Sequence, residues 1–409
     1  MASGILNTPA LLAAMQKPSI QSVMTRLMPA GNASIYALSS ALSSETALGT
    51  EHAFFTKTMV FPQMTLSAAA LSTDTVLNVG ATANVIPGQV YLVDSTQERI
   101  VVESVVSPSQ VRVTRGVGST AQAIALGINL WNIGNAYEEG SIRPQAVNIT
   151  PVRVSNFTQI FRNTWAVTES ARATAMLAGD TNVAESRQDC IKFHGIAIEQ
   201  QLIFGAKATS FRNGQPIRFM DGLINTVSNL AYYPSYYSAA NVFTAGATTN
   251  WTQLESMLDP VFSQAADPGS PNERLLYVGS AARKVINNIG RLNSTYYMEN
   301  GETSYGLQYS TFRTTRGTFT MMEHPLLNTN ASFSKMALAI DLKTMSIAYP
   351  TGRQTTSRDF NPSAGEDTAI AVDNGVDSTG GTLTTECTLM VRNPPANAVI
   401  YNLTAAALG

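Results

Sequence analysis

The sequence predicts an α+β protein in which one long helix separates a β-rich N-terminal half from a mixed C-terminal body. Three observations support this class. Residues 180–207 carry apolar side chains at spacings of three, four and seven, as one face of a helix does. Residues 62–136 contain short alternating strands separated by turn signals, and residues 250–403 mix strands with two shorter helical patterns.

The N-terminal segment, residues 1–49, is almost uncharged. Its only charged side chains are Lys17, Arg26 and Glu45. Such a segment cannot build a core of its own. We expect it to be disordered or to form an arm laid over a neighbouring molecule.

Two extended runs flank a compact β-region. Residues 51–61 (EHAFFTKTMVF) alternate as a strand does, and residues 148–167 resume the pattern. We predict that these runs pair as one long two-stranded ribbon. The strands TVLNV, QVYLVD, RIVVESVV and QVRVTRGV between them predict a small β-barrel or sandwich inserted at the ribbon tip.

The long helix has clear start and stop signals. Thr181 or Asn182 can cap its start, and Gly205 with Lys207 marks its end. Gly195 in mid-helix costs about 1 kcal/mol relative to Ala, so we expect a close packing contact there. The predicted apolar stripe is Val183, Cys190, Ile191, Ile198, Leu202 and Ile203, and the predicted polar surface includes Arg187, Lys192, Glu199 and Gln200.

The C-terminal body begins with a helix that Asn250 caps and Pro260 interrupts. The strand RLLYVG and the helix SAARKVINNIGR follow. Further strands are predicted at FTMMEH, KMALAIDL, MSIAYP, CTLMVRN and NAVIYNL, with a turn at residues 373–375.

The composition is poor in charge. Charged residues make up 13% of the chain, against about 25% in a typical soluble domain. Interface cores are depleted in charge, so we expect much of the surface to face other protein. The alternative is a β-rich protein whose surface strands favour Thr and Ser. The net charge of −2 gives no sign of a general nucleic-acid binder.

Cys190 and Cys387 lie far apart in the sequence without a CxxC motif, which predicts two buried free thiols in a reducing compartment. The apolar run near the N-terminus has no basic residue ahead of it, so it does not resemble a signal peptide. No run of eighteen apolar residues predicts a membrane span.

We predict no catalytic, cofactor or metal site. The three histidines, His52, His194 and His324, have no metal-ligand spacing, and HExxH, P-loop and nucleophile-elbow motifs are absent. His194 is expected to be packed or on the surface rather than catalytic. Residues 116–121 (GVGSTA) fit the outline of a dinucleotide fingerprint, but hairpin-spaced strands around them favour a Gly-rich β-turn.

Four tyrosines could stack bases or sugars, but no basic residues are interleaved with them, so loop packing or subunit contact is expected. They are Tyr232, Tyr233, Tyr236 and Tyr237.

Three segments carry a family resemblance. The first is residues 156–162, NFTQIFR, which match a family pattern N-[YF]-T-Q-I-F-R. The second is the long helix, which is similar to the spine helix of that family. Residues 386–400 match E-x-T-L-x-V-x-N-P-x-A-x-x-V-I, with Asn397 where His is frequent. Over about residues 51–403, the chain resembles the major capsid proteins of tailed bacteriophages, which have the Hong Kong 97-type fold.

The resemblance implies an N-terminal arm (1–50), an extended β-ribbon loop (51–61 and 137–168) and an all-β insertion domain (62–136). It also implies a spine-helix region (169–210), an axial domain with remaining peripheral elements (211–383) and C-terminal peripheral strands (384–409).

The resemblance implies a structural, non-enzymatic shell subunit that assembles into pentamers and hexamers around double-stranded DNA. Expected partners are itself, portal, scaffolding and decoration proteins, without a cofactor, metal or membrane. The expected location is the virion, after assembly in the host cytoplasm. Expected subunit-interface residues are Phe54, Phe55, Lys57, Phe61, Asn156, Gln159, Phe161 and Arg162.

Some relatives cross-link covalently through a lysine in this loop, although Lys57 is more simply a solvated ribbon lysine. Two other classes stay open: a phage tail or decoration protein, and a β-rich carbohydrate-binding adhesion protein.

Overall fold

The computed structural model describes residues 31–57, 63–82, 85–144, 146, 151–174, 182–233, 237, 239–263, 272–292, 299–300, 310–360 and 377–407. The chain divides into two compact units. Phe55–Arg153 form the smaller unit, and the residues before and after this segment form the larger one. Both helices and strands are present, so the α+β class is confirmed.

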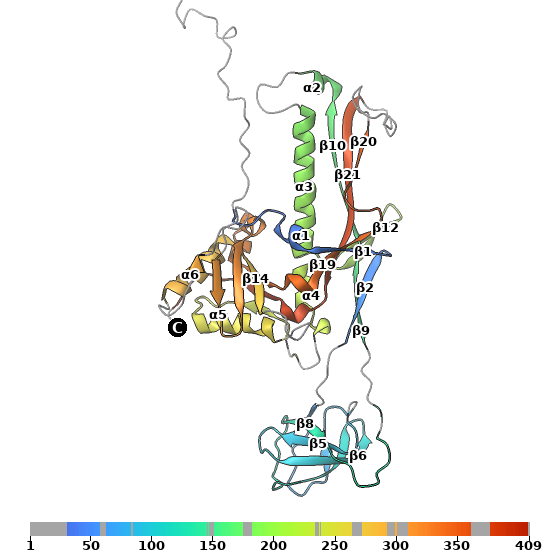
Figure 1. The fold of residues 1–409 in the computed structure, drawn as a ribbon, viewed down its shortest axis with the longest axis vertical. Coiled ribbons are helices and arrows are strands. Elements are labelled where there is room, and N and C mark those ends of the chain that lie inside the picture. The colour runs from blue at the N-terminus through green and yellow to red at the C-terminus, as the bar shows by residue number, and fades with distance from the viewer. Residues whose placement is uncertain are drawn as a thin grey trace, which may run out of the picture. The chain divides into compact units, whose positions relative to one another are not determined.

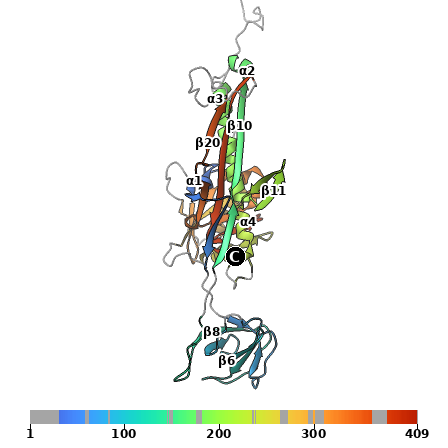
Figure 2. The same cartoon turned by 90° about the vertical axis from the view of Figure 1, so that its right-hand side faces the viewer.

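The larger unit is organised around the fourteen-residue strand β21 (Ser378–Val391). β10 (Gln159–Thr168) runs antiparallel along one side of it. β20 (Thr356–Phe360) and β19 (Met345–Pro350) pair with successive parts of the other side, and β1 (Ser43–Ala47) adds to β19 in parallel. Figures 1 and 2 both show β10, β21 and β20 side by side.

The predicted ribbon is correct for only part of its length. β2 (Glu51–Thr56) pairs with β9 (Val152–Phe157). At Thr158 the chain leaves this ribbon and continues as β10, which pairs with β21 instead. Alternation predicts a strand but not its partner, which explains the error. Phe61 and residues 147–150 lie outside the described residues.

The predicted long helix is α3 (Asn182–Phe204), which lies along β10 and β21 (Figure 1). Its buried residues are Cys190, His194, Glu199, Leu202 and Ile203. The prediction was therefore wrong for Ile191, which is 50% exposed, and for Glu199, which is fully buried. Both buried polar side chains have hydrogen-bond partners inside the protein, and this is what permits their burial.

The larger unit also contains a seven-stranded sheet, in the order β13-β22-β18-β14-β17-β16-β15. The central strand β14 pairs in parallel with β17 and antiparallel with β18. The strand bounds are Val242–Thr244 (β13), Glu273–Val278 (β14), Glu299–Asn300 (β15), Ser310–Arg313 (β16), Thr318–Glu323 (β17), Ala337–Ile340 (β18) and Ala398–Tyr401 (β22).

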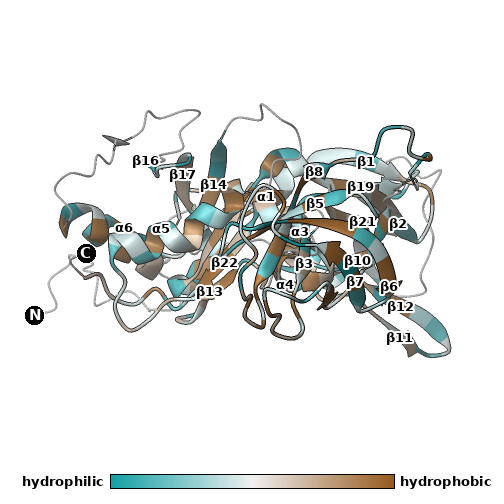
Figure 3. Ribbon diagram, turned by 90° about the horizontal axis from the view of Figure 1, so that it is seen from below, coloured by the Kyte–Doolittle hydropathy of each residue, from teal (hydrophilic) through white to brown (hydrophobic). Residues whose placement is uncertain are grey.

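Helices α5 (Trp251–Leu258) and α6 (Ser280–Leu292) bury apolar residues against this sheet (Figure 3). Asn250 caps α5, as predicted, and Gln253 completes a capping box. The helix ends before Pro260, where the chain continues as the 3₁₀ turn Asp259–Phe262. The predicted turn at residues 373–375 lies outside the described residues.

The sequence did not predict several short elements. These are the helices α1 (Ala37–Ala41), α2 (Glu169–Ala173) and α4 (Leu223–Ser228), and the hairpin of β11 (Ala208–Arg212) and β12 (Gln215–Phe219). Figures 2 and 3 show the hairpin projecting from its surroundings.

Six strands form the smaller unit, in the order β3-β8-β5-β6-β7-β4. A bridge between Leu66 and Val79 joins the two ends of the sheet, so it closes as a barrel. The four predicted strands are present, whereas β3 and β8 were missed. The strand bounds are Gln63–Thr65 (β3), Val76–Asn78 (β4), Gln89–Val93 (β5), Arg99–Ser107 (β6), Gln110–Thr114 (β7) and Asn129–Asn135 (β8).

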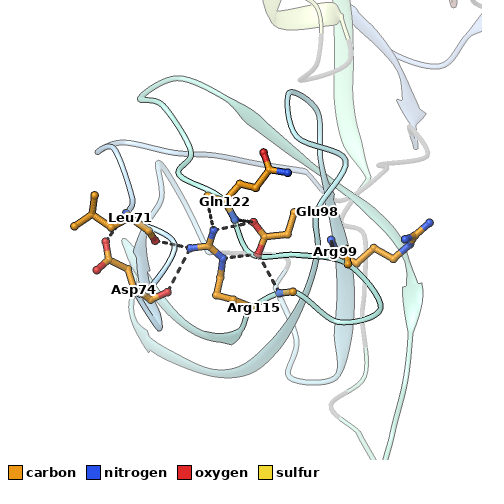
Figure 4. A network of polar contacts seen from close by, with 8 residues as sticks. Leu71, Asp74, Glu98, Arg99, Arg115 and Gln122 are labelled. Atoms are coloured by element: carbon orange, nitrogen blue, oxygen red, sulfur yellow. Dashed lines mark hydrogen bonds and ion pairs between the residues drawn. The ribbon is translucent and has the colours of Figure 1, made fainter.

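A buried ion pair joins the loops of the barrel (Figure 4). The guanidinium of Arg115 donates to both carboxylate oxygens of Glu98, at 2.7 and 2.8 Å. Glu98 also accepts from the backbone N–H groups of Gly116 and Gln122, at 3.0 and 3.1 Å. Arg115 donates further to the carbonyl of Leu71, at 2.9 Å. All three guanidinium nitrogens of Arg115 and both carboxylate oxygens of Glu98 therefore have hydrogen-bond partners.

This pair also explains the Gly-rich segment. Gly116 and Gly118 have φ of +67° and +65°, which favour glycine, so the predicted β-turn is confirmed. In a dinucleotide site, the backbone of such a segment would bind a phosphate. Here the N–H group of Gly116 donates to the Glu98 carboxylate of the same chain instead.

We predict that Glu98→Gln destabilises the barrel by about 3 kcal/mol, because Arg115 stays buried without its counter-charge. Burial alone would raise the pKa of Glu98, but hydrogen bonds from Arg115 and the backbone lower it. The pair therefore stabilises the barrel above a pH of about 4.3, and this stabilisation is lost as the pH falls through the lowered pKa.

Hydrogen exchange of β6 and β7 peptides, followed as a function of pH, measures this effect. The exposed Asp94→Asn is the matched control. An acid-dependent loss of protection that is the same in Glu98→Gln and in the unsubstituted protein would contradict the prediction.

Candidate functional site

Asn156 occupies a buried junction near the end of β9. Its Oδ1 accepts from the N–H groups of Phe157 and Asp221, at 2.8 and 2.7 Å. Its Nδ2 donates to the carbonyls of Asp221 and Leu389, at 3.0 and 2.7 Å. The amide thus uses its full hydrogen-bonding capacity. It ties β9 to β21 and to the segment that precedes α4.

The next motif residues extend this junction. Gln159 Oε1 accepts from the N–H of Met220 at 2.9 Å. Thr158 donates through its hydroxyl to Glu386 at 2.7 Å, and its N–H donates to the carbonyl of Thr50 at 2.9 Å. These contacts hold the chain where it passes from the β2–β9 ribbon to the β10–β21 pairing.

Two arginine side chains lie next to the Glu386 carboxylate at this junction. Arg353 Nε lies 2.9 Å and Arg218 Nη2 3.5 Å from its carboxylate. Burial alone would raise the pKa of Glu386, but hydrogen bonds from Thr158 and Arg353 and the two guanidinium charges lower it. The carboxylate is therefore held in its charged form, and it joins β21 and β12 to the β9–β10 junction and to the loop between β19 and β20.

A second junction holds residues 31–47 of the N-terminal segment against α3. Glu199 is fully buried, and its two oxygens accept from the N–H groups of Leu38 and Ser39, at 2.6 and 2.9 Å. A side chain of α3 thus caps α1, whose own N-cap residue Tyr36 makes no side-chain cap. We call the contact of Glu199, α1 and His324 the arm clasp.

His324 completes the arm clasp. Its Nδ1 accepts from the N–H of Leu326 at 3.2 Å, and its Nε2 lies 3.1 Å from a Glu199 oxygen. A nitrogen that accepts a hydrogen bond carries no proton, so the ring is neutral and Nε2–H donates to Glu199. Burial and the nearby Glu199 carboxylate raise the pKa of Tyr277, whose ring packs edge-on against His324.

Gly195 provides room for the same segment. A Cβ at this position would lie 2.5 Å from Cε1 of Tyr36, closer than atoms can approach. The close contact predicted at this glycine is therefore confirmed. Together with the parallel pairing of β1 and β19, it docks residues 31–47 on the larger unit.

The sequence missed the arm clasp because Glu199 was assigned to the polar surface. A signal was nevertheless present: Glu199 lies three and four residues before Leu202 and Ile203, on their face of the helix. Its partners His324 and α1 are distant in sequence, so periodicity could not identify them.

Other candidate residues have packing roles. His194 is buried between Asn163 Oδ1, at 2.8 Å, and Thr385 Oγ1, at 2.7 Å, and burial lowers its pKa. Cys190 and Cys387 are free and buried, as predicted; burial and nearby Glu386 raise the pKa of Cys387 to about 12.

The tyrosine cluster serves loop packing in its described part. Tyr233 is buried, its hydroxyl donates to the carbonyl of Val227 at 2.7 Å, and its ring packs against Tyr237. Tyr236 lies outside the described residues.

The expected interface residues fall into two groups. Asn156 and Phe161 are buried within the larger unit, and Gln159 bonds to Met220. Phe55, at 70% exposure, Lys57 and Arg162 are exposed, and Phe54 packs partly against Ala47, Ala348 and Met390.

Within the described residues, no cluster of three His, Cys, Asp or Glu side chains is arranged to hold a metal ion. No helix in the described part of the chain combines the length and apolarity needed to cross a bilayer.

Comparison with known proteins identifies the family. The profile of the SU10 major capsid protein family matches residues 6–404. The chain belongs to the SU10 major capsid protein family. It is also 33% identical to the major capsid protein of Pseudomonas phage PaMx41, over 99% of this chain and 96% of that protein. The resemblance to tailed-phage capsid proteins is thus confirmed, and the tail and adhesion alternatives lose their support.

Solved structures are also similar to this member of the family. The chain matches the capsid of a native GTA particle with 9% identity and a TM-score of 0.47, over 99% of this chain and 100% of the other. It matches the SrpI encapsulin of Synechococcus elongatus PCC 7942 with 9% identity and a TM-score of 0.48, over 99% of both chains.

We predict that Glu199→Gln releases residues 31–47, because an amide cannot accept from both α1 N–H groups. The expected cost is about 2 kcal/mol. Limited proteolysis should then cut before Glu51 at least tenfold faster, a factor that corresponds to about 1.4 kcal/mol. Gln200→Glu, on the exposed side of the same helix, is the control; equal cleavage of both variants would refute the arm clasp.

Asn156→Ala should destabilise the larger unit by about 3 kcal/mol, because it leaves two buried carbonyls and two N–H groups without their partner. Urea unfolding, followed by tryptophan fluorescence, measures this cost. Asn135→Ala, at an exposed site, should have no effect beyond about 0.5 kcal/mol. Equal midpoints for the two variants would show that the Asn156 junction contributes nothing to stability.

Proposed function

We propose that this chain is the shell subunit of an icosahedral phage head, in which copies form pentamers and hexamers around double-stranded DNA. The observation that carries the proposal is the family match across residues 6–404. The chain contributes no enzymatic step in this role. Its partners are further copies of itself and the portal, scaffolding and decoration proteins, with assembly in the host cytoplasm.

Exposed apolar side chains on and next to the β2–β9 ribbon support an assembly role. Leu48 is 96% exposed between β1 and β2, and Phe55 on β2 is 70% exposed. Large apolar side chains on a protruding ribbon are suited to contact with another protein. We infer that β2 and β9 reach over a neighbouring subunit, with Phe54, Phe55, Lys57 and Phe61 in this contact.

The buried motif residues support the same role indirectly. Asn156, Gln159 and Phe161 make their described contacts within the subunit, so we propose that they set the direction in which the ribbon leaves it. Arg162 is exposed on β10 and is available to a neighbour. The barrel is the insertion domain, which we place on the outside of the shell.

The low net charge of the chain is suited to a protein shell around packaged DNA. A net charge of −2 over 409 residues gives little general attraction to phosphates. A strongly basic wall would bind DNA tightly through counterion release, which would oppose its later exit.

Negative-stain electron microscopy tests the proposal, on the chain expressed alone and together with its neighbouring genes. We expect closed shells, rings of five or six, or polyheads. Uniform narrow tubes would indicate a tail protein. A monomer at high concentration under both conditions would refute the shell assignment.

A further inference from the structure

An apolar patch lies on the outer face of the barrel. Leu92 on β5 faces Trp131 on β8, and Val90 on β5 faces Val101 on β6. Trp131 is 42% and Ile133 51% exposed, whereas the alternate residues of the same strands fill the barrel core. We call Val90, Leu92, Val101, Trp131 and Ile133 the barrel patch.

The patch is not required by the barrel itself. The core contains thirteen buried apolar residues without any of its members. Ile133 follows Trp131 by two residues, so alternation places both on the outer face. A β-bulge, in which Tyr91 pairs with Asn132 and Val90 with Gly134, leaves Ile133 without a paired residue on β5. A Trp among aliphatic residues is typical of the centre of an interface.

Opposite charges flank the patch on one strand. Arg99 and Glu103 are both exposed on β6, two residues on either side of Val101. Four residues of strand separate them by about 13 Å, so they cannot pair with each other. Figure 4 shows Arg99 pointing away from the Glu98–Arg115 ion pair. Val101 and Glu103 line one side of a groove of about 690 Å³, whose lining also includes residues 136–138 and 141–144. Glu103 also accepts from the hydroxyl of Thr114.

This arrangement is self-complementary. If two copies place their β6 strands antiparallel across a two-fold axis at Val101, Arg99 of each copy faces Glu103 of the other. A two-fold contact uses the same patch on both molecules, so one strand supplies both charges.

We propose that the barrel patch joins two copies of this chain about a two-fold axis, with Val101 on the axis and two reciprocal Arg99–Glu103 pairs. This inference rests on the proposed shell function. The patch is small, so a single contact is weak, and repetition over a closed shell makes it effective.

Single-cysteine cross-linking within assembled shells tests the axis. The native Cys190 and Cys387 are buried and should not react. We expect Val101→Cys to give a dimer with a short bismaleimide. Val105→Cys, on the same strand and away from the axis, should give at least tenfold less. Shells without a Val101→Cys dimer, or with a product of another mass, would overturn the inference and leave the shell function intact.

Charge reversal in the Val101→Cys background tests the pairs. Arg99→Glu and Glu103→Arg should each lower the dimer yield about fivefold, because each places like charges opposite one another. The double reversal restores both pairs and should restore the yield. A double variant as weak as the single ones would refute reciprocal pairing. Trp131→Ala should lower the yield about tenfold, and an unchanged yield would exclude the patch from the contact.

Discussion

A buried carboxylate needs a complete set of hydrogen-bond partners, and this requirement at Glu199 governs how the larger unit is arranged. Two N–H groups of α1 and the Nε2–H of His324 satisfy it. The three partners come from two parts of the chain, residues 38–39 and residue 324, both more than a hundred residues away from Glu199. The burial of the Glu199 carboxylate therefore couples α3 to the N-terminal segment and to the residue that follows β17.

Complete hydrogen bonding of the backbone also determines the pairing of β21. β21 pairs with β10 on one side and with β20 and β19 on the other, so its backbone is satisfied over most of its length. At Thr158 the chain must pass from one pairing to another, and Asn156, Thr158 and Glu386 bind it there. Polar residues at a strand junction thus determine the direction in which the β2–β9 ribbon departs. In the shell that we propose, a neighbouring subunit is reached through this ribbon, so its direction must be fixed.

The barrel is held together by contacts of its own. Its core is separate from those of the larger unit, and the Glu98–Arg115 pair joins its loops. Both Glu98 and Glu386 keep a lowered pKa although burial acts in the opposite direction. Internal guanidinium partners therefore stabilise each unit independently. The barrel core contains none of the barrel-patch residues, so the patch is not needed to fill it.

The sequence by itself determined the local elements: the long helix, the capped helix at Asn250, four barrel strands and the Gly-rich turn at Gly116. Each depends on contacts within a few residues, such as periodic burial, a cap or a positive φ. The sequence also carried the motifs that indicated the family. Only the tertiary structure decided that β10 pairs with β21, that Glu199 is buried and that α1 lies on α3. Those outcomes depend on partners more than a hundred residues away, such as His324 for Glu199, which no local pattern can specify.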